Sequence, residues 1–163
     1  MSQKTLVRRL TIGAVIAAAY AALCLALMPI SFGAVQFRLS EALCILPLFF
    51  PEAVPGLFVG CLLANLLGGL GILDVVFGSL ATLIAAWMSY RLRNHPLLAI
   101  LPPVLVNAVI IGLVLYYAAG EPLWFSIGSI FLSQAVVCYV VGYPLYLLLK
   151  RSPFFRDAAA ENK

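Results

Sequence analysis

A succession of long apolar runs, separated by short polar breaks, constrains this chain more than any other feature. Of its 163 residues, 64% are hydrophobic and only 10% are charged, whereas soluble domains carry roughly 25% charged residues. A water-soluble fold of this length would have too few charges to cover its surface. The sequence therefore predicts an all-α integral membrane protein whose surface faces lipid.

The polar breaks divide the chain into six predicted membrane spans within a single membrane domain of residues 1–163. The approximate spans are 10–32, 39–50, 54–69, 72–90, 97–119 and 123–149. The first run exceeds the roughly 7–15 apolar residues of a signal-peptide core, so we expect a retained helix. The second is short, because about 12 helical residues cover about 18 Å of a hydrocarbon core about 30 Å thick. We expect a pocket near the short second and third spans.

Basic residues lie almost entirely on one side of the predicted bundle, so they indicate orientation rather than nucleic-acid binding. With the N-terminus in the cytoplasm, the residues inside are Lys4, Arg8, Arg9, Arg91, Arg93, Lys150, Arg151, Arg156 and Lys163. Only Arg38 then lies outside. This distribution predicts that both termini are cytoplasmic. The short polar tail that ends in Glu161–Lys163 is expected to fray.

Three polar side chains near the outer ends of different spans are the main candidates for a solute-binding site. They are Glu41 in the second span, Asn65 in the third and Asp74 in the fourth. Ionisable and polar groups at membrane depth are costly and by default indicate function. Arg38, three residues before Glu41, is included among the candidates.

Asn107 and Gln134 lie deeper, near the middle of the last two spans, and are candidates for the floor of the same pocket. Trp124, in an aromatic group at the turn between these spans, offers a face on which a planar ligand can stack. Trp124 is equally typical of the aromatic belt at a membrane interface. Asn107 and Gln134 are also suited to hydrogen bonds between helices.

The other candidates have structural interpretations too. Asp74 follows a glycine-rich turn and is suited to cap the next helix. Arg38 and Glu41 are spaced for an ion pair on one helix face. A purely structural role for all of these residues leaves the convergence of three polar groups at one depth unexplained.

Small residues recur every four positions in the first span. One row is Ala14, Ala18 and Ala22, and the adjacent row is Gly13, Ala17 and Ala21. Such rows let another helix approach closely. The spacing fits packing within the bundle as well as docking of a partner protein.

Motifs for catalysis are missing from the sequence. There is no G-x-x-x-x-G-K-S/T phosphate loop, no G-x-S-x-G elbow and no H-E-x-x-H pair, so we expect neither enzymatic activity nor ATP hydrolysis by this chain. The only histidine, His95, lies in a polar break. The four cysteines, which we interpret as packing residues without a metal site or disulfide framework, are Cys24, Cys44, Cys61 and Cys138.

Three stretches of the chain carry a resemblance to a known family. Val35–Ala42 reads VQFRLSEA, Pro55–Asn65 reads PGLFVGCLLAN, and Asp74–Thr82 reads DVVFGSLAT. These motifs resemble the QueT family of proposed queuosine-precursor transporters. The family comprises substrate-binding S components of energy-coupling-factor (ECF) transporters, and the likeness extends from about Leu6 to Arg151.

The resemblance implies a fold and a set of partners. It implies a six-helix S-component bundle in a bacterial cytoplasmic membrane that captures a vitamin-like solute from outside. Such proteins dock through small residues of the first helix onto a coupling transmembrane protein, which is driven by two ATPase subunits. The row Ala14, Ala18 and Ala22 matches the A-x-x-x-A docking motif. ATP would be used by the partners, so no cofactor is expected here.

The implied solutes are 7-deazaguanines, in 7-cyano or 7-aminomethyl form. A guanine-like edge presents two adjacent N–H donors, which a carboxylate of Glu41 or Asp74 can accept. An amide of Asn65, Asn107 or Gln134 can meet the carbonyl. Two alternatives stay open: an S component for another small vitamin-like solute, and a self-sufficient secondary transporter.

Overall fold

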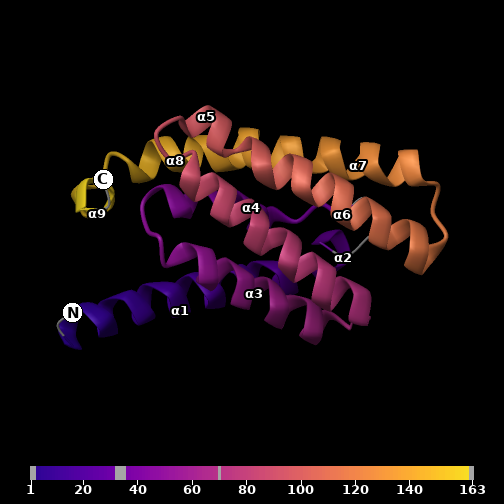
Figure 1. The fold of residues 1–163 in the computed structure, drawn as a ribbon, viewed down its shortest axis with the longest axis horizontal. Helices are drawn as coiled ribbons and strands as arrows, with labels where there is room; N and C mark the ends of the chain where they lie inside the picture. The colour runs from indigo at the N-terminus through magenta and orange to yellow at the C-terminus, as the bar shows by residue number, and fades with distance from the viewer. Residues whose placement is uncertain (1–2, 32–35, 70, 162–163) are drawn as a thin grey trace.

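The computed structural model describes residues 3–31, 36–69 and 71–161 of the chain. These residues form helices of several kinds, and no strand occurs among them. The long helices lie alongside one another as a bundle (Figure 1). The predicted end of the first span at residue 32 and the basic residue Lys163 lie outside the described residues.

Three helical segments are long and apolar enough to cross a membrane, as expected of a membrane protein. The first is α1 (Gln3–Ala26), which the short α2 (Met28–Ser31) follows. The second joins α5 (Pro96–Ala99) to α6 (Leu101–Ala119). The third runs through α7 (Leu123–Ala135), η3 (Val136–Gly142) and α8 (Tyr143–Leu149).

Shorter helices make up the centre of the chain. They are η1 (Leu39–Leu48), α3 (Ala53–Gly68), η2 (Asp74–Gly78) and α4 (Ser79–Arg91). Because η1 and α3 are apolar but too short to qualify by length, the count of six spans stays a prediction. Gly69 ends α3 and Gly120 ends α6, each with a positive φ that glycine adopts without a steric penalty.

The 3₁₀ helix η1 is enclosed by the rest of the bundle. It packs against α1, α4 and η3, and eight of its ten residues are buried. Pro47 lies inside this helix, and a proline there removes a backbone donor and disfavours a regular α-helix. The short, irregular second span of the sequence is therefore the innermost element, and its polar residues Ser40 and Glu41 lie inside the protein.

Helices α1 and α3 approach each other at two glycines. A Cβ added to Gly56 would lie 2.7 Å from the Gly13 carbonyl oxygen, and one added to Gly60 would lie 2.7 Å from that of Ala17. Only residues without a side chain permit this contact. The row Gly13, Ala17 and Ala21 thus packs within the bundle.

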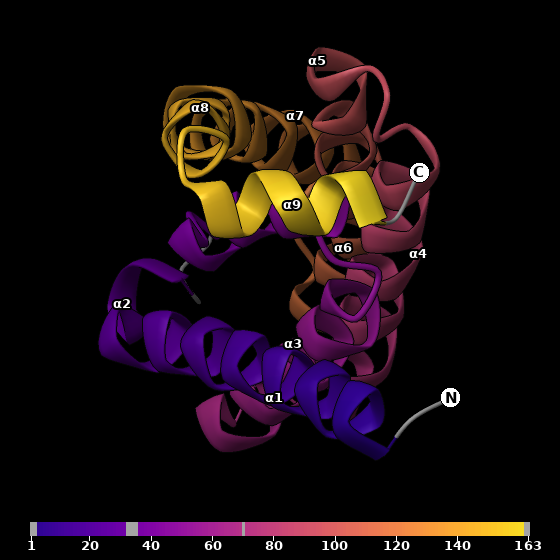
Figure 2. The same ribbon diagram turned by 90° about the vertical axis from the view of Figure 1, so that its left-hand side faces the viewer.

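A C-terminal helix, α9 (Pro153–Glu161), crosses one end of the bundle (Figure 2). Phe155 packs edge-on against Phe49 and Phe50, with ring centroids 5.4 Å apart in both pairs, and Ala158 is buried. The prediction of a frayed tail is wrong for these residues, because apolar side chains one helical turn apart dock on the bundle.

Most basic residues belong to the segments that meet at this same end, which we name the basic end. It comprises Arg8, Arg9, Arg91, Arg93, Lys150, Arg151 and Arg156. Figure 1 shows the start of α1, the α4–α5 turn and α9 together there. The turns after α3 and α6 lie toward the opposite end (Figure 1).

Candidate solute-binding site

The polar candidates of the sequence are inside the bundle and face neither lipid nor water. Arg38, Glu41, Asn65 and Asp74 are at most 6% exposed, and so are Asn107 and Gln134. A polar group buried among helices needs hydrogen-bonding partners. The contacts of these residues therefore show which of them the fold brings together.

Glu41 is held by residues of three helices. The Tyr20 hydroxyl of α1 donates a hydrogen bond of 2.5 Å to Oε1, and the Cys44 thiol of η1 donates one of 3.1 Å to Oε2. The Cys138 thiol of η3 lies 3.9 Å from the Glu41 backbone oxygen and the same distance from Gln134 Oε1. Gln134 therefore borders the Glu41 group through Cys138.

Cys61 of α3 is the centre of a second group. Its sulfur accepts from Asn65 Nδ2 at 3.5 Å and from the Thr82 hydroxyl at 3.3 Å, and Arg38 Nη1 lies 3.9 Å away. The sulfur is fully buried. A weakly polar thiol thus joins α3, α4 and the segment before η1.

Asn65 and Asp74 meet where α3 faces η2. Asn65 Nδ2 donates to the Asp74 backbone oxygen at 2.9 Å, and a Cβ added to Gly78 would lie 2.9 Å from that same nitrogen. The π-helical turn η2 widens the helix at this point, and such turns are frequent at functional sites. Asp74 lies inside a helical segment that starts at Ile72 and interacts with the side chain of Gln36, so it is not a helix cap.

Arg38 connects the two groups. Its Nη1 lies 3.9 Å from the Cys61 sulfur, and its guanidinium is near enough to interact electrostatically with Glu41 and with Asp74. We name these five residues, Tyr20, Arg38, Glu41, Asn65 and Asp74, the polar cluster. Arg38 precedes η1 with an extended backbone, so it does not share a helix face with Glu41, and the expected ion pair between them stays a prediction.

The polar cluster has hydrogen-bonding capacity that the described residues do not use. Asn65 Oδ1 and Asp74 Oδ1 are buried with no hydrogen-bond partner among them, and so is the Ser79 hydroxyl. Unsatisfied buried oxygens are rare, and each calls for an explanation such as a ligand or water. These three acceptors come from the junction of α3, η2 and α4, so a donor-rich molecule there would satisfy them.

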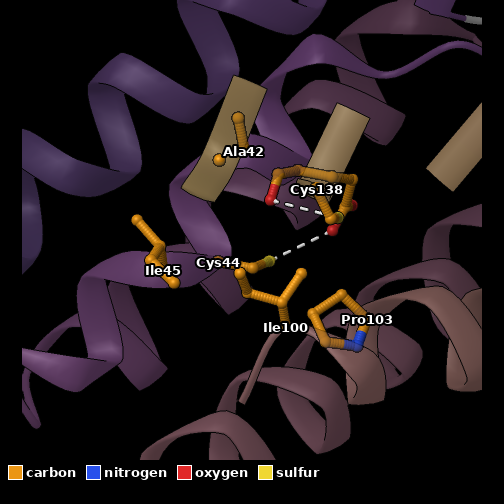
Figure 3. Close-up of a pocket in the computed structure, with 8 residues that line it drawn as sticks. Ala42, Cys44, Ile45, Ile100, Pro103 and Cys138 are labelled. Carbon is orange, nitrogen blue, oxygen red and sulfur yellow. Dashed lines mark hydrogen bonds between the residues drawn. The ribbon is translucent and has the colours of Figure 1, made fainter. Parts of the chain in front are cut away.

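A small cavity adjoins Glu41 on the side of η3 and α6. Its volume is about 10 Å³, which is room for about one water molecule. Figure 3 shows Ile45, Ile100 and Pro103 near Cys44, with a dashed line from the Cys44 sulfur. The acceptor of this hydrogen bond is Glu41 Oε2. Ligand pockets measure about 300–1,000 Å³, so this cavity holds no solute unless the surrounding helices move.

The remaining predicted site residues are not all brought to the polar cluster. Asn107 is buried on α6, a helix that packs against η2 and α4. Trp124, at the start of α7, is 82% exposed. Its ring faces outward, as an aromatic-belt residue does, and the structure does not place it beside Glu41 or Asp74.

Tyr20 and Cys61 are the two most central of the contact residues that the sequence analysis did not name as site candidates. Tyr20 lies within an alanine-rich helix and is fully buried, and its hydroxyl required a partner. Cys61 was interpreted as a packing residue, because a lone thiol in an apolar run gives no signal of its contacts. A tyrosine among small residues on the inner face of α1 was the available signal.

The docking candidates of α1 are on its outer face. Ala14, Ala18 and Ala22 are exposed, whereas Ala17 and Ala21 in the adjacent row are buried. The two rows therefore have different surroundings: one contacts α3, and the other leaves a smooth strip on the protein surface.

Comparison with curated proteins and with solved structures gave no match. A family model described as QueT transporter matches residues 10–151. The matched range contains the whole polar cluster, the exposed alanines of α1, most of the first long apolar segment and all of the other two. The chain is therefore a transporter protein and belongs to the QueT family.

Proposed function

We propose that this protein is the substrate-binding S component of an ATP-driven ECF importer, and that it captures a 7-deazaguanine-type queuosine precursor. The observation that carries the proposal is the buried polar cluster with its unused oxygens at Asn65 and Asp74. Carboxylate and amide oxygens accept hydrogen bonds from the adjacent N–H donors of a guanine-like edge. The amide of Asn65 supplies a donor for the carbonyl of the same edge.

The charge of the polar cluster favours a cationic solute. Glu41 and Asp74 are two carboxylates and Arg38 is one guanidinium, so the ionised cluster has one excess negative charge. A buried charge is stabilised by an opposite charge nearby. The cationic 7-aminomethyl form therefore fits better than the neutral 7-cyano form.

Orientation follows from the basic end, which we place in the cytoplasm of a bacterial cell by the positive-inside rule. The polar cluster, which includes Arg38, then lies in the outer half of the membrane, close to the turn between α3 and η2. Solute from outside would approach the half of the bundle that encloses these residues. Because the cavity beside Glu41 is only about 10 Å³, solute entry requires separation of the elements that cover the cluster.

Energy for transport would come from partner subunits. The exposed strip Ala14, Ala18 and Ala22 is suited to a coupling transmembrane protein, because small residues let helix backbones approach closely. Two ATPase subunits would drive that protein. Helix α1 holds both this strip and Tyr20, which contacts Glu41, so one rigid element links docking to the solute site.

Binding measurements on the purified protein test this function. Calorimetric titration with 7-aminomethyl-7-deazaguanine should show saturable binding, weaker binding of the 7-cyano form, and none of riboflavin or biotin. Glu41→Gln and Asn65→Ala should each weaken binding about tenfold or more, since an unsatisfied buried partner costs about 1–3 kcal/mol. Glu52→Gln, which alters an acid paired with Arg9 at the basic end, is the matched control.

Unchanged affinity in both cluster variants would exclude this site. Binding of a different vitamin-like molecule, identified by mass spectrometry of what co-purifies, would keep the S-component role and replace the solute. Uptake by cells that lack the ATPase partners would contradict the ECF role.

A further inference from the structure

The basic end contains a hollow that the transport site does not use. Its volume is 380 Å³, and its walls come from the α4–α5 turn, the end of α8 and α9. Arg93, Lys150 and Arg156 line it, one from each of these segments. Figure 2 shows α5, α8 and α9 around this end of the bundle.

The walls of the hollow are fixed by packing. Phe49 forms part of its floor and lies 5.4 Å, between ring centroids, from both Tyr146 and Phe155. Phe155 anchors α9, which contributes Arg156 to the lining. The side chains of Arg93 and Lys150 lie over aromatic rings, with the charged groups 4.5 Å from the Tyr90 centroid and 5.9 Å from that of Tyr146.

The charge around the hollow is of one sign. None of the described residues that line it carries a carboxylate. Glu52 pairs with Arg9 at 2.9 Å and lines a different cavity, and Asp157 of α9 is exposed outside the lining. The positive-inside rule requires basic residues on this side of the membrane, but it does not require three of them to converge on one concavity.

We propose that this hollow binds the phosphate group of an anionic phospholipid from the cytoplasmic leaflet. Lys150 directly follows the last apolar span and so lies at the depth of the headgroups. Leu48, Phe49 and Pro96 supply apolar walls beside the cations, which suits a molecule with a charged phosphate and an apolar body. Basic pockets at the cytoplasmic ends of membrane helices bind anionic headgroups in this way. A free inorganic phosphate carries the same chemistry without the apolar body.

The test compares pairs of substitutions that remove the same charge. In the full chain, Lys150→Gln/Arg156→Gln alters the hollow, whereas Arg91→Gln/Arg151→Gln removes two neighbouring basic residues that do not line it. Each detergent-solubilised protein is titrated with phosphatidylglycerol or phosphatidylcholine, and bound lipid is counted by native mass spectrometry. The preference for phosphatidylglycerol should fall about thirtyfold in the first pair, because each cation contributes about 1 kcal/mol, and should persist in the second.

Further measurements test the role of charge and identify the source of the bound phosphate. Lys150→Arg/Arg156→Lys keeps both charges and should retain the preference. Competition by millimolar inorganic phosphate that depends on Lys150 and Arg156 would overturn the lipid assignment, because it would show that the hollow binds a soluble anion. Equal loss in both glutamine pairs, or no preference in the unaltered protein, would overturn the proposal. Solute titration reports on the opposite end of the bundle, so the two proposals fail separately.

Discussion

The Tyr20 hydroxyl of α1 donates a 2.5 Å hydrogen bond to Glu41 Oε1 on η1, deep inside the bundle. Both side chains are at most 1% exposed. The bond joins the helix that has the alanine strip to the helix that has the central carboxylate of the polar cluster. Removing it should loosen the link between these two elements.

Tyr20→Phe is expected to lower the free energy of unfolding by about 1.5–3 kcal/mol, the contribution of a hydrogen bond to a charged group. Denaturant unfolding in detergent, followed by circular dichroism, measures the change. Tyr139→Phe is the control, because that hydroxyl donates to the Leu97 backbone oxygen at 3.2 Å in an exposed position. Its effect should stay within about 0.5 kcal/mol. Equal effects of the two substitutions would show that Tyr20 does not stabilise Glu41.

Gly60→Ala should separate α1 from α3. The new Cβ would lie 2.7 Å from the Ala17 carbonyl oxygen and 2.8 Å from Tyr20 Cβ, and overpacking of this kind costs about 1–3 kcal/mol. Thermal unfolding in detergent should show the loss. Gly128→Ala meets nothing within 4 Å and should be neutral or stabilising, because alanine favours a helix over glycine by up to about 1 kcal/mol. A stable Gly60→Ala variant would contradict the close packing of the two helices.

Neighbouring alanines of α1 should respond in opposite ways to one substitution. Ala18 is exposed, so Ala18→Phe should leave folding and solute binding unchanged while reducing co-purification with the proposed coupling protein at least tenfold. Ala17 is 6% exposed against α3, so Ala17→Phe should prevent folding. Size-exclusion chromatography and affinity capture from cells that express all subunits give the two readouts. If the Ala18→Phe variant still assembled completely with its partner subunits, the row Ala14, Ala18 and Ala22 would not be part of the docking surface.

Much of the architecture was accessible from periodicity and hydropathy. The apolar runs at 97–119 and 123–149 correspond to the long segments Pro96–Ala119 and Leu123–Leu149. The polar candidates Glu41, Asn65 and Asp74 are buried, as expected of costly groups that lipid cannot solvate. Trp124 illustrates the limit of such predictions. Its position in the sequence fits either a surface for ligand stacking or an aromatic belt at the membrane interface, and only the fold shows that it is exposed.

The sequence alone determined that the protein is a helical membrane protein and which family it resembles. These properties depend on composition, on the length of the apolar runs and on motifs along the chain. Only the tertiary structure decided which small-residue row packs on α3, which groups touch Glu41, and that α9 closes the basic end. The physical reason is that these contacts join residues far apart in the chain, such as Tyr20 with Glu41, or Cys138 with the Glu41 backbone oxygen. The residues on either side of a side chain in the sequence do not indicate which distant helix will pack against it.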